Sequence, residues 1–413
     1  MNKRSFYVII LCIFIMISTI SCTKSHENIN ENIVDNNITV LQKSQNTKQS
    51  FFYQQVEFGK GTIDKIMAII DKNIVYFKYA DNDTVISYFN YDMDTDTTYK
   101  LGDIKNPYIN SGEVAQIEKK LYFYMNEMVS DDKNPDGKLE TTLYEIDIEA
   151  NTLQSIITDQ IDKTLVYIDV LDDNIVSFKG RNENNYGIGY IDSIDVNKKR
   201  KEQSQKEILL SAEYDNDKGE GNLIYNFTQS NNFLYTLEAK VVDVEKRIFT
   251  IKQYDSKGKF VREIELEKAI TDILKGERVS NLKIVGQYAF IRTFSGAGVL
   301  CDISNNIAVA RLIDNEELDV AYGAENGKEA NHILIYSRNK GDMWLLDIKT
   351  STLYSLDVNF ENIEYVVIDN TTNILISAFN DDDTKSSLIY LNYMDIPIED
   401  SIAFTNGVTL FNN

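Results

Sequence analysis

The sequence has very few histidines, cysteines, prolines and tryptophans: 2 His, 3 Cys, 3 Pro and 1 Trp in 413 residues. It also contains no P-loop, no nucleophile-elbow serine, no paired-histidine zinc motif and no dinucleotide fingerprint. His26 lies in a polar segment and His332 begins an apolar run, so we expect neither to be a catalytic base. These absences favour a binding protein over an enzyme. They do not exclude chemistry based on paired carboxylates, which sequence alone cannot reveal.

Positive charge is also scarce. The chain has 42 Lys and Arg against 64 Asp and Glu, a formal net charge of -22. Such a charge repels phosphate backbones, so we expect no nucleic-acid partner. The chain is rich in residues that suit a pleated sheet, with 25 Tyr and 19 Phe among many Ile and Val. We therefore predict an all-β fold.

The first residues read as an export signal. Lys3 and Arg4 precede an apolar run over residues 6–17, which is short for a membrane-spanning helix. The run is followed by "TISC", in which Ser21 directly precedes Cys22. This ending resembles the lipobox of bacterial lipoproteins, although Thr19 stands where a Leu is usual. The resemblance implies a signal peptide over residues 1–22 and lipid on Cys22. An ordinary signal peptide that happens to contain a cysteine is the alternative.

Lipidation would place the protein outside the cytoplasm, anchored to a cell membrane. The Ile, Asn and Lys richness fits a bacterial source, and we expect a monomer. Residues 23–50 are polar, Asn-rich and without sustained periodicity, which predicts a disordered tether. With Cys12 in the signal and Cys22 lipidated, Cys301 alone remains for the mature fold, so no internal disulfide can form. Its apolar neighbours, "GVLCDI", predict a buried core thiol.

A repeat fills residues 51–413. An apolar strand that closes on an acidic or amide residue, followed by a polar corner and a second strand, recurs with Asp92, Asp147, Asp195, Asp255, Asp302, Asp347 and Asn392 at the closing position. The intervals, by subtraction, are 55, 48, 60, 47, 45 and 45 residues. Two further apolar runs precede most pairs, for example "LVYIDVL" and "DNIVSFKG". Four strands per unit and a period near fifty predict a single β-propeller of seven four-stranded antiparallel blades. Six or eight blades, or stacked β-sandwiches, are the alternatives.

Individual units resemble known propeller blades. "LYEIDIEANTLQSI" and "WLLDIKTSTLYSL" are similar to blades of the TolB-like and YVTN-like bacterial superfamily, and "IKQYDSKGKFVREIEL" resembles an NHL-type blade. The resemblance covers nearly all of residues 51–413 and implies the fold, but its motifs are too general to imply an activity. The last unit is short by one strand, which "FFYQQVEF" from Phe51 or "GVTLF" from Gly407 could supply. We favour the N-terminal segment, because it would cover an exposed sheet edge.

Long acidic insertions are expected on one face of such a propeller. Four second-to-third-strand loops and one blade-to-blade loop would open together there, and the acidic loops contribute the candidate ligand-binding residues Asp81, Asp83, Asp132, Asp136, Asp215, Asp217, Asp381 and Asp382. The basic run at residues 198–201 falls in a third-to-fourth hairpin on the opposite face, where a solvated turn is the simplest reading.

One acidic loop has the spacing of a calcium site. "DKNPDGKLE" places Asp132, Asn134 and Asp136 at alternating positions before a Gly, with Glu140 at the ninth place. The twelfth place is Leu143 where an EF-hand has a bidentate Glu. A plain solvated turn is the alternative to calcium, and the sequence implies no other cofactor.

The sequence thus predicts a lipid-anchored, cell-surface propeller that binds or scaffolds an extracellular protein or glycan through its acidic loop face. A carboxylate-based hydrolase or lyase acting on an extracellular polymer such as a glycan is the alternative. A third possibility is an envelope-assembly factor that offers strand edges to other chains.

Overall fold

The computed structural model divides the chain into two units, Met1–Thr39 and Val40–Asn413, and every strand below belongs to the second unit except the two-residue strand Thr39–Val40, which spans the boundary. The structure describes residues 39–40, 54–55, 65–80, 84–105, 107–110, 113–131, 134–160, 165–180, 188–197, 207–215, 218–243, 246–275, 277, 279–314, 317–322, 331–358, 360, 362–369, 372–379, 387–403 and 408–409. No helix in these residues is long and apolar enough to span a membrane.

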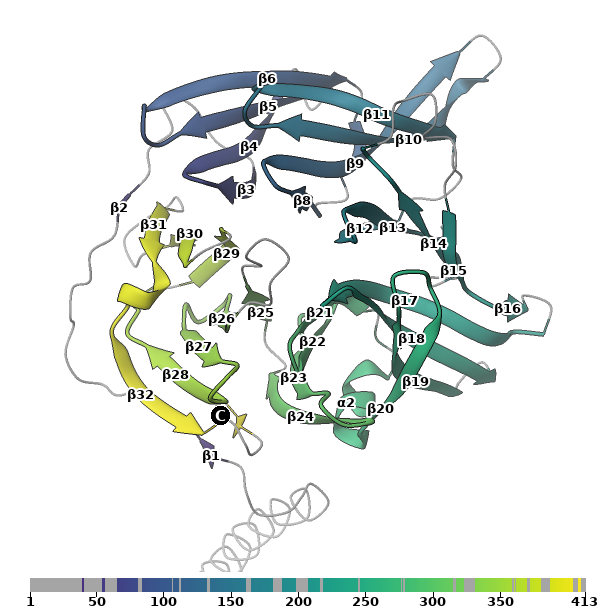
Figure 1. The fold of residues 1–413 in the computed structure, drawn as a ribbon, viewed down its shortest axis with the longest axis vertical. Coiled ribbons are helices and arrows are strands. Elements are labelled where there is room, and N and C mark those ends of the chain that lie inside the picture. Colours follow the sequence, from purple (N-terminus) through teal and green to yellow (C-terminus); the bar gives the residue numbers. More distant parts are fainter. Residues whose placement is uncertain are drawn as a thin grey trace, which may run out of the picture. The chain divides into compact units, whose positions relative to one another are not determined.

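The described residues are mostly antiparallel sheet (Figure 1). The first sheet contains β3 (Lys65–Ile70), β4 (Asn73–Ala80), β5 (Val85–Asp92) and β6 (Thr97–Lys105). The second contains β7 (Pro107–Asn110), β8 (Ala115–Ile117), β9 (Lys120–Asp131), β10 (Asn134–Asp147) and β11 (Thr152–Gln160). The third contains β12 (Leu165–Leu171), β13 (Asn174–Gly180), β14 (Gly189–Ile194) and β15 (Glu207–Ser211). We name each sheet by its strands, as the β3–β6, β7–β11 and β12–β15 sheets.

Two further separate sheets come from the C-terminal part of the chain. The β25–β28 sheet contains β25 (Leu318–Ala321), β26 (His332–Ser337), β27 (Met343–Asp347), β28 (Thr352–Leu356) and, on its outer edge, β32 (Ile398–Ala403). The β29–β31 sheet contains β29 (Asn362–Ile368), β30 (Asn373–Phe379), β31 (Ser387–Asn392) and β2 (Gln54–Gln55). A short 3₁₀ helix, η1 (Tyr393–Asp395), follows β31.

Between the third and the β25–β28 sheets lies one curled sheet of eleven strands. It contains β16 (Tyr214–Asp215), β17 (Glu220–Ser230), β18 (Phe233–Asp243), β19 (Lys246–Tyr254), β20 (Phe260–Leu266), β21 (Val279–Val285), β22 (Tyr288–Thr293), β23 (Gly298–Asp302) and β24 (Ile307–Asp314), together with β1 (Thr39–Val40) and β33 (Val408–Thr409). Two antiparallel runs, β17–β20 and β21–β24, meet where β20 and β24 pair in parallel at Glu265–Ile307 and Leu266–Ala308. Helix α2 (Lys268–Leu274) follows β20 and buries Ile270 and Leu274.

The prediction of an all-β propeller is therefore confirmed, and the blade count needs a correction. By hydrogen bonding, the described residues form five separate sheets and one curled sheet, where seven separate blades were expected. The backbone pairing between β20 and β24 joins two of the predicted units into one sheet.

Side-chain packing divides the same residues differently. Along the chain the strands form seven groups: β3–β6, β8–β11, β12–β15, β17–β20, β21–β24, β25–β28, and β29–β31 with β2. The buried apolar side chains of the described residues form seven clusters, and each cluster packs two neighbouring groups against each other. One of them packs Ile66, Ile69 and Ile74 of the first sheet against Leu375 of the β29–β31 sheet, so the last group packs on the first. Every sheet is thus apolar on both faces, and the groups close into the propeller-like ring visible in Figure 1.

The repeated acidic residue has a structural explanation. It ends the third strand of each group or directly follows it, and its side-chain oxygen accepts hydrogen bonds from backbone N–H groups of the turn that follows. This holds for Asp92, Asp147, Asp195, Asp255, Asp302, Asp347 and Asn392. Asp347, for example, accepts from the N–H groups of Lys349 and Thr350 at 2.8 and 3.1 Å. In the first six groups this local bond folds the corner between the third and fourth strands, and at Asn392 it caps the 3₁₀ helix that follows β31, which is why the pattern recurs.

Tight turns also join first to second strands. Asp71–Lys72, Asp172–Asp173 and Asn231–Asn232 have φ between 46° and 64°, in the left-handed region. Two such residues form the turn whose twist matches that of a hairpin, and Asp and Asn tolerate this region better than most residues. The first-to-second and third-to-fourth turns lie at the same end of each sheet, since neighbouring strands are antiparallel. We call this end of the ring the turn end, and the other the loop end.

Strands from the two ends of the chain complete three different sheets. β2 pairs antiparallel with β31, at Gln54–Tyr390 and Gln55–Ile389, so the N-terminal segment supplies the missing outer strand, as predicted. β32 returns to the preceding sheet and pairs with β28. β33, from the segment weighed as the alternative, pairs with the outer strand β24 at Leu312–Val408.

Candidate functional site

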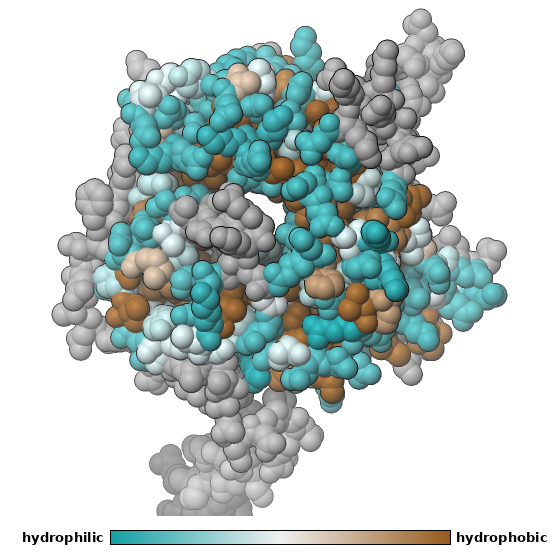
Figure 2. All heavy atoms as spheres, in the orientation of Figure 1, coloured by the Kyte–Doolittle hydropathy of each residue, from teal (hydrophilic) through white to brown (hydrophobic). Residues whose placement is uncertain are grey.

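The first strands of six consecutive groups bring polar side chains together at the centre of the ring. We call this set the axial cluster: Lys65, Glu113, Asp169, Thr228, Lys283 and Tyr322. Lys65 begins β3, Glu113 precedes β8, Asp169 lies in β12, Thr228 in β17 and Lys283 in β21, and Tyr322 follows β25. Figure 2 shows an opening near the centre of the ring.

Two carboxyl groups from neighbouring first strands form the core of the cluster. Oε2 of Glu113 accepts a hydrogen bond from the N–H of Ile168 at 3.3 Å. Asp169, the next residue, accepts from the N–H of Gln229 at 2.9 Å and from the Thr228 hydroxyl at 3.2 Å. These bonds connect the β7–β11 sheet, the β12–β15 sheet and the curled sheet. They hold both carboxyl groups at defined positions beside each other.

The environment keeps one of these groups protonated. Burial, and to a smaller extent the charge of Asp169, raise the pKa of Glu113 to about 8, against the opposing effects of the Ile168 N–H and the charges of Lys283 and Lys65. Burial also raises the pKa of Asp169, to about 6, against the hydrogen bonds it accepts. At neutral pH Glu113 therefore carries a proton and Asp169 is largely ionised. Adjacent carboxyl groups with separated pKa values are typical of functional sites.

The other members of the cluster add donors and an aromatic ring. Nζ of Lys283 donates to the carbonyl oxygen of Val320 at 2.9 Å and lies 5.8 Å from the centre of the Tyr322 ring. Burial lowers the pKa of Lys65, with the charge of Glu113 opposing. Burial and the nearby Asp169 raise the pKa of Tyr322, which stays a neutral phenol. The cluster thus presents hydrogen-bond donors and acceptors of both charges to one centre.

Two members of the cluster, Lys65 and Glu113, lie on its loop-end side, whereas Asp169, Thr228 and Lys283 lie three residues before the turns that end their strands. Lys65 is the first residue of β3, which ends in the Asp71–Lys72 turn, and Glu113 stands on the far side of β8 from the turn at Glu118. A ligand entering from the loop end would meet these two side chains first.

The structure places few of the acidic-loop residues predicted from the sequence. Asp81, Asp83, Asp132, Asp217, Asp381 and Asp382 lie outside the described residues, as does Cys22. Asp215 is described and exposed in β16, where its Oδ2 lies 3.0 Å from Nζ of Lys218. The acidic loop face therefore stays a prediction.

The predicted calcium loop is mainly strand. β10 begins at Asn134, so the backbone of Asn134, Asp136 and Glu140 belongs to a hairpin in which Glu140 pairs with Glu127 and Gln160. The expected loop is shorter because β9 and β10 extend into it. In the described part of the chain no three His, Cys, Asp or Glu side chains are arranged to hold a metal ion. Calcium binding through these residues remains a prediction that the described geometry does not test.

Cys301 and His332, which were also considered in the sequence, both have structural roles. Cys301 is fully buried, its thiol donates to the carbonyl of Ala289 at 3.3 Å, and burial raises its pKa to about 12, so the prediction of a core thiol is confirmed. His332 starts β26, half-buried, with Nδ1 3.4 Å from the Tyr393 hydroxyl.

Sequence reasoning did not select the axial cluster. Three of its members are charged residues inside otherwise apolar runs: Lys65 in "IDKIMAII", Asp169 in "LVYIDVL" and Lys283 in "SNLKIV". A charge inside a strand that is apolar on both faces signals a special environment. Their convergence, however, depends on the ring, and Glu113 has no such local signal.

Comparisons with known proteins do not identify a family for this chain. No family model matches the chain, and no curated protein matches it. Among solved structures, the chain is similar to the crystal structure of the computationally designed Ika8 protein, with 12% sequence identity and a TM-score of 0.43. That match covers 80% of this chain and 97% of the designed one. The assignment of a β-propeller-like fold rests on the strand pairing and the seven apolar clusters. Such a fold in general suggests a binding or scaffolding module.

Proposed function

We propose that the protein is a lipid-anchored, extracytoplasmic binding module that recognises a polar ligand at the loop end of its ring. The observation that carries this proposal is the convergence of six first strands on the axial cluster. Partly exposed donors and acceptors lie there on a rigid scaffold, and such a set fixes the orientation of a ligand. The acidic loops around this end, together with the net charge of -22, would attract cationic ligands and make association depend on salt.

Binding is tested with the full chain and two soluble probes, poly-L-lysine and neutral dextran. We expect poly-L-lysine to bind and to dissociate as salt is raised. The double variant Glu113→Gln and Asp169→Asn should weaken binding about tenfold, the cost of a lost charged hydrogen bond. Asp94→Asn, which alters an exposed carboxylate at the turn end, is the matched control. The proposal would be contradicted if the wild type, the double variant and Asp94→Asn bound poly-L-lysine equally, or if the wild type bound neither probe.

Anchoring is tested separately by cell fractionation. We propose that "TISC" directs lipid attachment to Cys22, as the lipobox resemblance implies. Cys22→Ser should move the protein from the membrane fraction to the soluble fraction and abolish labelling by an alkynyl fatty acid. Retention of the variant in the membrane fraction would refute lipid anchoring without affecting the binding test.

A second candidate function is carboxylate-based hydrolysis or elimination on an extracellular glycan. The specific observation in its favour is a proton-carrying Glu113 beside a largely ionised Asp169. A protonated carboxyl group is a general acid, and an ionised one is a base or nucleophile. If this function is correct, Glu113→Gln should abolish cleavage of a fluorescently labelled glycan while leaving its binding intact. A binding module would lose affinity and show no cleavage in either form.

A further inference from the structure

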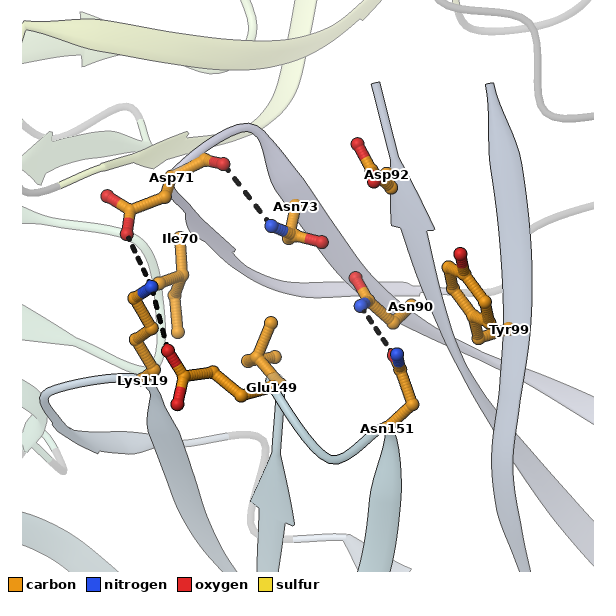
Figure 3. A pocket seen from close by; sticks show the side chains of 10 residues that line it. Ile70, Asp71, Asn73, Asn90, Asp92, Tyr99, Lys119, Glu149 and Asn151 are labelled. Atoms are coloured by element: carbon orange, nitrogen blue, oxygen red, sulfur yellow. Dashed lines mark hydrogen bonds and ion pairs between the residues drawn. The ribbon is translucent and has the colours of Figure 1, made fainter. Parts of the chain in front are cut away.

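A second polar site lies at the turn end, away from the axial cluster. A cavity of about 180 Å³ opens between the β3–β6 sheet and the β7–β11 sheet. Figure 3 shows its lining, which comes from the turns that follow β3, β8 and β10 and from strands β3, β4, β5 and β6. None of these residues belongs to the axial cluster or to the predicted acidic loops.

The cavity is lined by a buried acceptor that no group in the described residues satisfies. Asn90 is 1% exposed, and its Nδ2 donates to Oδ1 of Asn151 at 2.8 Å. Its own Oδ1 has no hydrogen-bond partner among the described residues. Figure 3 shows this oxygen turned away from Asn151. A buried polar atom without a partner is costly, so this atom calls for a donor from outside the chain.

The charged groups at the rim also favour binding of a cation. Nζ of Lys119 lies 3.0 Å from Oε1 of Glu149 and 3.8 Å from Oδ2 of Asp71. Asp92 also lines the cavity, and its hydrogen bonds, first that with the Thr95 hydroxyl, hold the pKa of its carboxyl below the usual range. Three carboxylates against one ammonium leave a local charge of -2. The rim is therefore under-neutralised.

Metal ions fit this arrangement poorly. No group of three His, Cys, Asp or Glu side chains in the described residues converges closely enough to hold a metal ion. An organic ammonium group reaches across a wider space and carries three directed N–H donors. Tyr99, 39% exposed, adds an aromatic ring to the lining.

We propose that this cavity binds the primary ammonium group of a small polar molecule, with one N–H donated to Oδ1 of Asn90 and the charge balanced by Asp92, Asp71 and Glu149. The group can come from an amino sugar or from a lysine side chain. The proposal is independent of the function assigned to the axial cluster.

The test is calorimetric titration of the full chain with glucosamine and with N-acetyl-lysine amide, each beside its amine-acetylated form. Acetylation removes the positive charge and two of the donors while leaving the remainder of each molecule unchanged. We expect at least one amine to bind and its acetylated form to bind at least about tenfold more weakly. The amine that binds identifies the source of the group. Equal binding of the amine and its acetylated form, or binding of neither amine, would overturn the proposal.

Two substitutions should act in opposite directions. Asn90→Leu, nearly the same in shape, removes the buried acceptor and should weaken amine binding about tenfold. Lys119→Gln removes the competing cation from the exposed rim and should strengthen binding a few-fold, more at low salt. Ser351→Ala is the matched control, because Ser351 occupies the corresponding turn and accepts from the Tyr288 hydroxyl at 3.0 Å. Unchanged affinity in Asn90→Leu, or weaker binding in Lys119→Gln, would also refute the assignment, and thermal denaturation of each variant verifies its folding.

Discussion

Single charged residues inside apolar first strands give this ring its chemical character. Asp169 is surrounded by apolar neighbours in β12, yet its carboxylate accepts three hydrogen bonds, from Val170, Thr228 and Gln229. Those bonds compensate for much of the loss of water around the charge, which explains how an ionisable group persists there. Glu113 accepts a hydrogen bond from the N–H of Ile168, and its pKa is raised further above its ordinary value than that of Asp169. The two neighbouring carboxyl groups therefore behave differently because their partners differ.

The shifted pKa of Glu113 makes stability depend on pH. Between the ordinary pKa near 4.5 and the folded value of about 8, the folded chain holds a proton that the unfolded chain releases, so the free energy of unfolding falls as pH rises. Glu113→Gln cannot ionise and should lose this component. We expect the variant to gain on the wild type by on the order of 1–2 kcal/mol between pH 5 and pH 8, allowing for the accessible part of the side chain. Urea denaturation at both pH values measures this. A constant difference between the two proteins would contradict the assigned shift.

For single residues, the sequence predicted structural roles better than functional ones. The seven closing Asp or Asn residues could be selected by their spacing, and each accepts the turn bonds that the pattern requires. Cys301 could be placed in the core from its neighbours alone. Asn90 and Glu113 could not be selected, because their significance depends on residues about 60 and 55 positions away, Asn151 and Ile168.

Elements owe their regularity to two kinds of turn. Left-handed pairs such as Asp71–Lys72 close the first hairpin, and the side-chain bonds of the closing Asp or Asn shape the last. Both kinds depend on local residues only, which is why strands could be placed from sequence. Pairing between β20 and β24 could not, since it joins backbone edges and leaves no side-chain pattern. The segment at 134–140 was expected as a loop for its Gly and Asp content, but its pairing with β9 extends the hairpin.

The turn bonds of Asp347 should contribute measurably to stability. Asp347→Ala removes the acceptor for the N–H groups of Lys349 and Thr350, and we expect a loss of about 1 kcal/mol in the free energy of unfolding. Asp347→Asn keeps an oxygen in the same place and should retain most of it. Equilibrium denaturation of the three proteins decides the matter. Equal losses in both variants would mean that the charge, and not the turn bond, is responsible.

The whole molecule is held by side chains on both faces of every sheet and by the chain termini at its rim. β2 covers the outer edge of β31, while β32 and β33 cover β28 and β24. The first of these could be predicted, because a missing outer strand in the last unit requires a donor. The destinations of β32 and β33 could not, since an edge strand accepts many partners.

Removal of β2 should therefore expose a sheet edge. A chain that starts at residue 61 lacks β2, and one that starts at residue 51 retains it and is the matched control. We expect the shorter chain to unfold at a lower temperature and to self-associate, because the backbone groups of β31 at Ile389 and Tyr390 lose their partners. Thermal denaturation and size-exclusion chromatography test this. Identical behaviour of the two chains would show that β2 is dispensable.

Because the apolar cluster that includes Leu375 and Ile66 packs the last group on the first, every group has a neighbour on both sides. If the backbone is cut between any two neighbouring groups, the two fragments still contact each other through two apolar interfaces, one at the cut and one at the closure of the ring. A protease acting at the loop end would nick this protein without dismantling it, and the pieces, once parted by denaturant, would be able to find one another again.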